Sequence, residues 1–173
     1  MLYVLATPIG NLQDITLRAL DVLLSVDFIA AEDTRHTGRL LKGRNPKGRF
    51  ISYHEHNEEK RTPLLLEKLK AGFSVAVVSN AGTPSISDPG FRLVESAVAR
   101  NIPVSPVPGV SAAIAALSVS GLPTDSFVFI GFLSRKKGRR TEQLTSLGDM
   151  PRTMIMYESP KRISRLLDDL LAV

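Results

Sequence analysis

Short apolar runs alternate with helical patterns along most of the chain. Five runs are predicted to be strands, at residues 2–6, 27–31, 49–53, 74–79 and 102–107. Helical patterns follow them at residues 14–24, 34–42, 57–71, 91–98 and 110–119. Pro63 is expected to break or restart the third helix, because proline lacks a backbone N–H. The inner strands show no polar alternation, which is typical of a parallel sheet covered by helices on both faces.

A second unit is predicted to begin after Gly121-Leu122-Pro123. Strands are expected at 127–133 and 153–158, a basic loop at 135–140, and a helix at 161–171. We therefore predict an N-terminal α/β domain at residues 1–121 and the start of a C-terminal α/β domain at residues 122–173. About fifty residues are too few to bury a good core, so the second domain is expected to be incomplete.

The charge of the chain favours a polyanionic partner. The net charge is +5 and the pI is about 9.7. The cations gather in two groups: Lys42, Arg44, Lys47 and Arg49, and then Arg135, Lys136, Lys137, Arg139 and Arg140. Solvated loop charge is the alternative explanation for each group. The absence of cysteine excludes thiolate catalysis and disulfides and fits a cytoplasmic protein, and no apolar run approaches membrane-spanning length.

Three loops follow predicted strands and are rich in glycine, proline and small polar residues: Thr7–Leu12, Ser79–Gly90 and Val107–Ala112. In an open α/β sheet, ligands bind outside the carboxyl ends of the strands. Ser79–Gly90 is longer than a strand-to-helix turn needs, so it is the strongest candidate for a small-molecule site. The first loop is no G-x-G-x-x-G fingerprint, which gives a nucleotide pyrophosphate cradle little support.

Two further segments carry groups that titrate or bind protons. Asp33 follows the second strand and is a good helix N-cap, whereas the adjacent Arg35 and His36 do not serve the cap. His54 and His56 are two residues apart, but no third ligand follows at a recognised metal spacing. We therefore predict no metal site, and interpret these histidines as substrate contacts or proton acceptors.

Several motifs occur together in a characteristic order. They are Thr7-Pro8-Ile9-Gly10-Asn11-Leu12, Ala31-Glu32-Asp33-Thr34-Arg35, Ser79–Gly90, Val107-Pro108-Gly109-Val110-Ser111-Ala112, Phe127–Leu133 and Tyr157-Glu158-Ser159-Pro160-Lys161-Arg162. The ordered set resembles the small-subunit ribosomal RNA methyltransferase I family, within the tetrapyrrole-methylase-like superfamily of S-adenosylmethionine enzymes. The resemblance covers essentially the whole chain.

The resemblance implies two α/β domains with S-adenosylmethionine in the cleft between them, usually in a homodimer. It implies methyl transfer to the ribose 2′-hydroxyl of a decoding-site cytidine in 16S ribosomal RNA or the 30S particle. Thr83 stands where relatives in the superfamily carry a cofactor-binding aspartate. The positions expected to contact the cofactor are Pro8, Ile9, Gly10, Gly82, Thr83, Ile86, Ser111, Ala112 and Tyr157.

Transfer to a hydroxyl is helped by a nearby proton acceptor. Asp88, Asp33, His36 and His54 are the candidates, and Asp88 is preferred, although it is equally suited to capping the next helix. RNA contacts are expected from Arg35 and from both basic groups. Two alternatives remain: a methyltransferase acting on small tetrapyrroles, and a basic RNA-binding module without catalysis.

Overall fold

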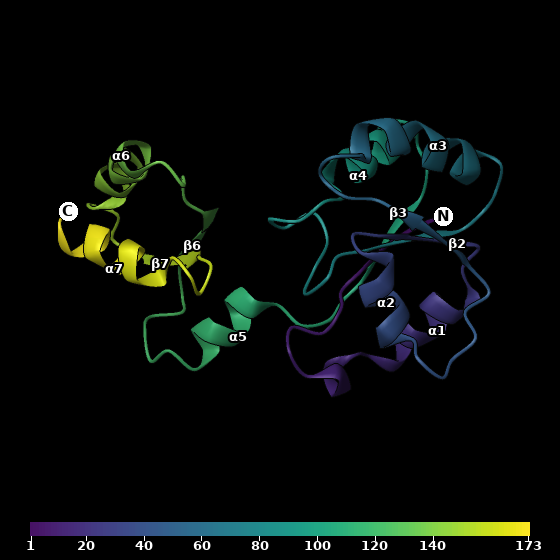
Figure 1. Cartoon of the computed structure of the whole chain (residues 1–173), viewed down its shortest axis with the longest axis horizontal. Coiled ribbons are helices and arrows are strands. Elements are labelled where there is room, and N and C mark those ends of the chain that lie inside the picture. The colour runs from purple at the N-terminus through teal and green to yellow at the C-terminus, as the bar shows by residue number, and fades with distance from the viewer. The chain divides into compact units, whose positions relative to one another are not determined.

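A computed structural model describes residues 1–173, which form two compact units (Figure 1). The units comprise residues Met1–Ala112 and Ala113–Val173. The domain division expected between residues 121 and 122, and the incompleteness of the second domain, stay predictions. No helix has both the length and the apolar character needed to cross a membrane.

The N-terminal unit contains a five-stranded sheet in which every neighbouring pair is parallel. Its strands are β1 (Leu2–Leu5), β2 (Phe28–Ala31), β3 (Arg49–Ser52), β4 (Val75–Val78) and β5 (Val104–Val107). They lie in the order β3-β2-β4-β1-β5, so β1 is placed between β4 and β5. The predicted fold class, a parallel-sheet α/β unit, is confirmed.

Helices cover both faces of this sheet, as predicted (Figure 1). They are α1 (Leu17–Ser25), α2 (Thr34–Leu40), α3 (Glu58–Lys70) and α4 (Phe91–Val98). Successive residues of a strand point to opposite faces. In β4, Ala76 and Val78 therefore pack with α1, whereas Val75 and Val77 pack with α3 and α4.

Two details of the predicted helices are wrong. α3 continues through Pro63 without a break. Proline removes one hydrogen bond, and the burial of Leu65, Leu66 and Leu69 holds the helix against the sheet despite that loss. α1 begins at Leu17 rather than at residue 14, because residues 12–14 form a separate 3-10 turn and the Thr16 hydroxyl caps α1 through the Ala19 N–H.

The C-terminal unit is smaller. It contains α5 (Ala112–Ser118), β6 (Phe127–Phe132), α6 (Lys137–Leu147), β7 (Thr153–Tyr157) and α7 (Ile163–Leu171), with β6 and β7 parallel. The prediction that residues 135–140 form a loop is wrong from Lys137 onward, where α6 begins. Arg140 and Leu144, four residues apart, are both buried on one side of α6. Burial of that side stabilises a helix in a segment whose local composition suggests a loop.

Candidate functional site

The loops that follow β1 and β4 are joined by their backbones. Thr7 and Gly82 exchange two hydrogen bonds, each 2.9 Å from nitrogen to oxygen, and the Thr7 hydroxyl donates to the Ser79 carbonyl at 3.0 Å. Gly82 has a φ of +79°, a conformation that glycine adopts without steric cost. A side chain there would also contact Ile9, since a Cβ would lie 3.7 Å from its Cγ2.

The loop after β5 approaches the same edge. A Cβ on Gly109 would lie 2.9 Å from the Cβ of Ala6, so the loops after β1 and β5 can meet only because this residue is glycine. The structure thus brings the three predicted cofactor loops together around the end of β1. Of their predicted contacts, Pro8 and Gly82 are buried, Ile9, Thr83 and Ser111 are half-buried, and Gly10, Ile86 and Ala112 are exposed.

Tyr157 belongs to the C-terminal unit. Its hydroxyl accepts a hydrogen bond from the Ala113 N–H at 3.2 Å, near the start of α5. Its ring packs edge-on against Phe129 and Phe132, with centroids 4.9 and 5.6 Å away. Within its own unit, Tyr157 therefore fixes the beginning of α5.

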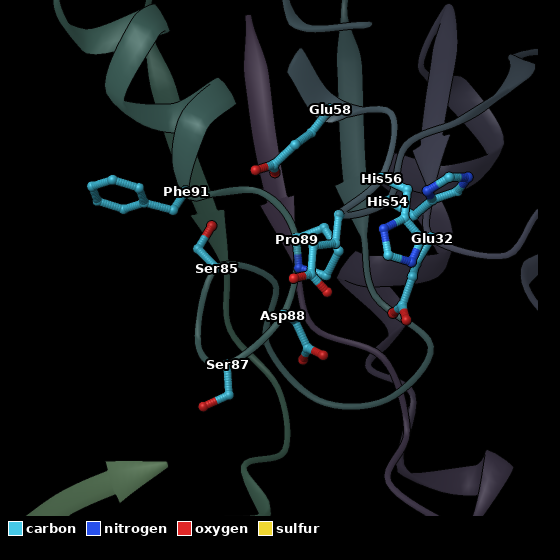
Figure 2. A pocket seen from close by; sticks show the side chains of 10 residues that line it. Glu32, His54, His56, Glu58, Ser85, Ser87, Asp88, Pro89 and Phe91 are labelled. Carbon is cyan, nitrogen blue, oxygen red and sulfur yellow. The ribbon is translucent and has the colours of Figure 1, made fainter. Parts of the chain in front are cut away.

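A pocket of about 570 Å³ lies at the edge of the N-terminal sheet, on the side of β2 and β3 (Figure 2). The end of β2, the segment after β3 and the second half of the Ser79–Gly90 loop line it. The lining residues are Glu32, His54, Glu55, His56, Glu58, Ser85, Ser87, Asp88, Pro89 and Phe91. The Ser79–Gly90 loop therefore contributes to two sites. Its Gly82 end joins the β1 loop, and its Asp88 end forms one wall of this pocket.

Of the four candidate proton acceptors, Asp88 and His54 line the pocket, whereas Asp33 and His36 do not. Burial and the nearby Glu32 carboxylate raise the pKa of Asp88 to about 6, and the Ser79 hydroxyl offsets part of that rise. The alternative role in capping does not apply, since the N-cap of α4 is Gly90 and no side chain caps that helix. Ser85 and Ser87 have φ values of +72° and +60°, so the backbone beside Asp88 is strained.

Glu32 stands opposite this loop and is fixed by it. Its Oε2 accepts a hydrogen bond of 2.9 Å from the Asn80 N–H. Glu58, another acid of the lining, pairs with Arg92 at 3.5 Å. Sequence reasoning did not single out either glutamate. The sequence does indicate Glu32 in one way, because it directly follows a buried strand. The adjacent Asp33 and Arg35 were chosen as candidates from that segment instead.

The environment of His54 determines its tautomer. Asn57 accepts the His54 backbone N–H at 2.9 Å through Oδ1, so its Nδ2 faces the ring and donates to Nε2 at 3.0 Å. The ring proton therefore lies on Nδ1, which is buried and has no hydrogen-bond partner. No group of three or more metal-binding side chains is arranged to hold an ion anywhere in the chain.

The remaining catalytic candidates lie outside the pocket. Asp33 caps α2, accepting the Arg35 and His36 backbone N–H groups at 2.8 and 3.4 Å. The Arg35 N–H in particular lowers the pKa of Asp33, which makes this carboxylate a weaker proton acceptor. The side chains of Arg35 and His36 are exposed.

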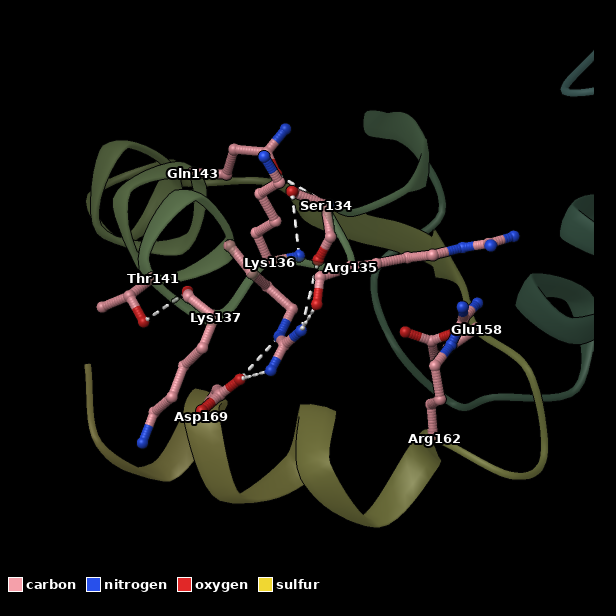
Figure 3. Close-up of polar contacts among 10 residues, drawn as sticks. Ser134, Arg135, Lys136, Lys137, Thr141, Gln143, Glu158, Arg162 and Asp169 are labelled. Atoms are coloured by element: carbon pink, nitrogen blue, oxygen red, sulfur yellow. Dashed lines mark hydrogen bonds and ion pairs between the residues drawn. The ribbon is translucent and has the colours of Figure 1, made fainter.

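The cations of the two basic groups differ in their exposure and in their ion pairs. Lys42, Arg44, Lys47 and Arg49 are exposed, and Lys47 pairs with Asp27 at 3.3 Å. Arg135, Lys136, Lys137 and Arg139 are exposed as well. Arg140 is buried: its Nε donates to Asp169 at 2.6 Å, and its Nη1 donates to the carbonyls of Ser134 and Arg135 at 3.2 and 3.3 Å (Figure 3). Its guanidinium is therefore unavailable to RNA phosphates.

Curated relatives match the chain along its whole length. One, named "Ribosomal RNA small subunit methyltransferase I", from Vibrio cholerae, is 53% identical over 173 residues, covering 100% of this chain and 60% of that protein. A protein of the same name from Synechocystis is 55% identical, covering 98% of this chain and 61% of that protein. The chain thus spans about 60% of the length of these relatives.

Solved structures share the fold. The cobalt precorrin-4 methyltransferase CbiF superposes with a TM-score of 0.69 at 18% identity, covering 99% of this chain and 74% of that one. Uroporphyrin-III C-methyltransferase from Thermus thermophilus, complexed with S-adenosylhomocysteine, gives a TM-score of 0.64 at 22% identity, covering 99% and 75%. The family described as Tetrapyrrole (Corrin/Porphyrin) Methylases matches residues 1–173, and the chain belongs to it.

Proposed function

We propose that this protein transfers a methyl group from S-adenosylmethionine to the 2′-hydroxyl of a decoding-site cytidine in small-subunit ribosomal RNA. The names of its relatives and its family membership support methyl transfer to ribosomal RNA. The observation that carries the proposal is the Ser79–Gly90 loop. One end of it meets the β1 loop, and the other holds a half-buried acid in a pocket.

The three joined loops suit S-adenosylmethionine. The small residues of these loops and the exposed Ile86 leave room for a flat ring. The closely approaching backbones offer N–H and C=O groups to a zwitterionic ligand. Contacts are assigned to Pro8, Ile9, Gly10, Gly82, Thr83, Ile86, Ser111 and Ala112, with Tyr157 as a further one. When bound, the cofactor supplies an activated methyl group.

The chain's own part in the reaction is to move a proton and orient the acceptor. A ribose hydroxyl is a poor nucleophile while it keeps its proton. Asp88, with a pKa of about 6, is mostly ionised at neutral pH and is more basic than an ordinary aspartate. We assign it the role of accepting the proton of the 2′-hydroxyl as the methyl group is transferred.

RNA binding is assigned to exposed cations and leaves Arg140 out. Phosphate contacts dominate the affinity of proteins for nucleic acids. The assigned residues are Arg35, Lys42, Arg44, Lys47, Arg49, Arg135, Lys136, Lys137 and Arg139. We further propose a homodimer that acts in the cytoplasm, where small ribosomal subunits are assembled.

A small tetrapyrrole is the second candidate substrate, because the solved neighbours act on such compounds. Full-length protein, labelled S-adenosylmethionine and small subunits lacking the modification test the choice, with uroporphyrinogen III in a parallel reaction. We expect label in RNA, recovered as 2′-O-methylcytidine after digestion. Label in the tetrapyrrole alone would contradict the proposal.

A further inference from the structure

We infer that the pocket beside Asp88 receives an unstacked nucleobase with an exocyclic amino group, and that Glu32 accepts a hydrogen bond from that group. The inference rests on the proposed function and adds how the base of the target nucleotide is read. It concerns the pocket bounded by Glu32, His54 and Phe91, which lies apart from the joined cofactor loops along the Ser79–Gly90 segment.

The charge of the pocket selects against phosphate. Four carboxylates line it, those of Glu32, Glu55, Glu58 and Asp88, and no lysine or arginine is among the lining residues. Only Glu58 has a cationic partner, Arg92. Like charges repel more strongly in a partly buried site than in water. The part of an RNA that enters must therefore be uncharged and rich in N–H or O–H donors, as a nucleoside is.

The size and lining of the pocket fit a splayed nucleotide. Its volume of about 570 Å³ falls in the range of sites for small molecules. Phe91 lines it while 64% exposed, and His56 is exposed too, so aromatic faces are available for stacking. Proteins that read RNA by sequence stack unpaired bases on such side chains and bond the base edges.

Glu32 is the lining acid best prepared to read an amino group. The Asn80 N–H fixes Oε2 at 2.9 Å, which leaves Oε1 to accept from a ligand. Carboxylates accept from the amino group of cytosine, whereas the carbonyl that uracil carries there would meet a second acceptor.

An independent observation also points to a polar ligand. Two lining residues carry buried polar atoms without partners, His54 Nδ1 and Ser85 Oγ. An unpaired buried donor is costly, and the ring acceptors of a base would satisfy it. The fixed tautomer of His54 makes Nδ1 a donor, complementary to Glu32 as an acceptor.

The variant Glu32→Gln tests the inference with little change of shape. The glutamine carbonyl keeps the bond to the Asn80 N–H, while its amide NH₂ offers a donor where the carboxylate offered an acceptor. Glu59→Gln is the matched control, because Glu59 is exposed on α3 and does not line the pocket. Methyl transfer by the full-length protein is compared on small-subunit RNA with cytidine or uridine at the target.

We expect the wild type and Glu59→Gln to prefer cytidine roughly 10- to 100-fold in kcat/KM, and Glu32→Gln to lose most of that preference. Saturation-transfer NMR with free cytidine and uridine provides a second readout that needs no catalysis, and the same ranking is expected. An unchanged cytidine preference in Glu32→Gln, or no difference between the nucleosides in the wild type, overturns the inference. Absence of transfer to either RNA, with cytidine still selected by NMR, contradicts the proposed function instead.

Discussion

The two compact units are stabilised in different ways. The N-terminal unit buries clusters of apolar side chains on both faces of a five-stranded sheet. The C-terminal unit has two strands and a buried cluster of Leu133, Leu144 and Leu166. Because a small unit buries less apolar surface, single polar contacts carry more of its stability. The Arg140–Asp169 pair between α6 and α7 is a contact of this kind.

The buried charged side chains of the two units also have different neighbours. In the C-terminal unit, Arg140 and Asp169 neutralise each other, with side chains only 9% and 10% exposed. In the N-terminal unit, Asp88 faces another acid, Glu32. A buried charge beside an opposite charge is neutralised and held in place. A carboxyl group beside a second carboxylate has a raised pKa, which is common among residues that act as acids or bases in catalysis. The comparison therefore predicts that the first kind affects folding and the second affects catalysis.

The largest effect is expected from Asp88→Asn. Removal of a general base lowers rates about 10²- to 10⁴-fold. We expect kcat for methyl transfer to fall by that amount, while calorimetry shows unchanged affinity for S-adenosylmethionine and thermal unfolding shows no loss of stability. Asp33→Asn serves as the control, since Asp33 caps α2 outside the pocket. Equal loss of activity in both variants would remove the distinction between Asp88 and a capping aspartate.

Arg140→Ala should instead unfold the C-terminal unit. Removing one partner of a buried ion pair leaves the other charge uncompensated, at a cost of about 3–5 kcal/mol. Hydrogen exchange should therefore show early loss of protection in α6 and α7 and normal protection in β1 and β4. Arg139→Ala, a change at the exposed neighbour, should leave protection intact. If Arg139→Ala were as damaging as Arg140→Ala, burial of the pair would not be the cause.

Much of the N-terminal unit could be predicted from its sequence, because strand and helix periods differ and the buried strands lack polar alternation. Asp33 as an N-cap also follows from local chemistry. Strand order cannot be predicted this way. The apposition of Thr7 with Gly82, 75 positions later in the chain, depends on β1 lying beside β4.

The C-terminal unit and the pocket were harder to predict for the same physical reason. Arg140 was grouped with four basic neighbours, and only the position of Asp169 on another helix distinguishes it. The orientation of Glu32 likewise depends on the Asn80 N–H, which lies 48 residues away in the sequence. Contacts between distant segments decide whether a charged side chain is solvated, paired or held in a pocket, and no local pattern encodes them.

The raised pKa of Asp88 predicts how methyl transfer and the stability of the N-terminal unit change with pH. Asp88 must be ionised to accept a proton, so kcat/KM for transfer should rise about tenfold per unit below pH 6 and level off above it. The stability of the N-terminal unit should change in the opposite direction with pH. Because the folded pKa of about 6 exceeds the ordinary 3.8, the N-terminal unit should lose stability as the pH rises between these values. Asp88→Asn should abolish that loss, as followed by chemical denaturation, and a persisting slope would assign the titration to another group.

The smallest effect is expected from the exposed cations of the C-terminal unit. Lys136→Gln and Arg139→Gln each remove one exposed charge that a phosphate can approach. Each should weaken RNA binding a few-fold and lower the slope of log affinity against log salt by about 0.7–0.9. Filter binding at several salt concentrations measures both quantities. Stability should not change, because surface charges contribute little to folding. An unaltered salt slope in the variant that carries both changes would show that RNA phosphates contact neither Lys136 nor Arg139.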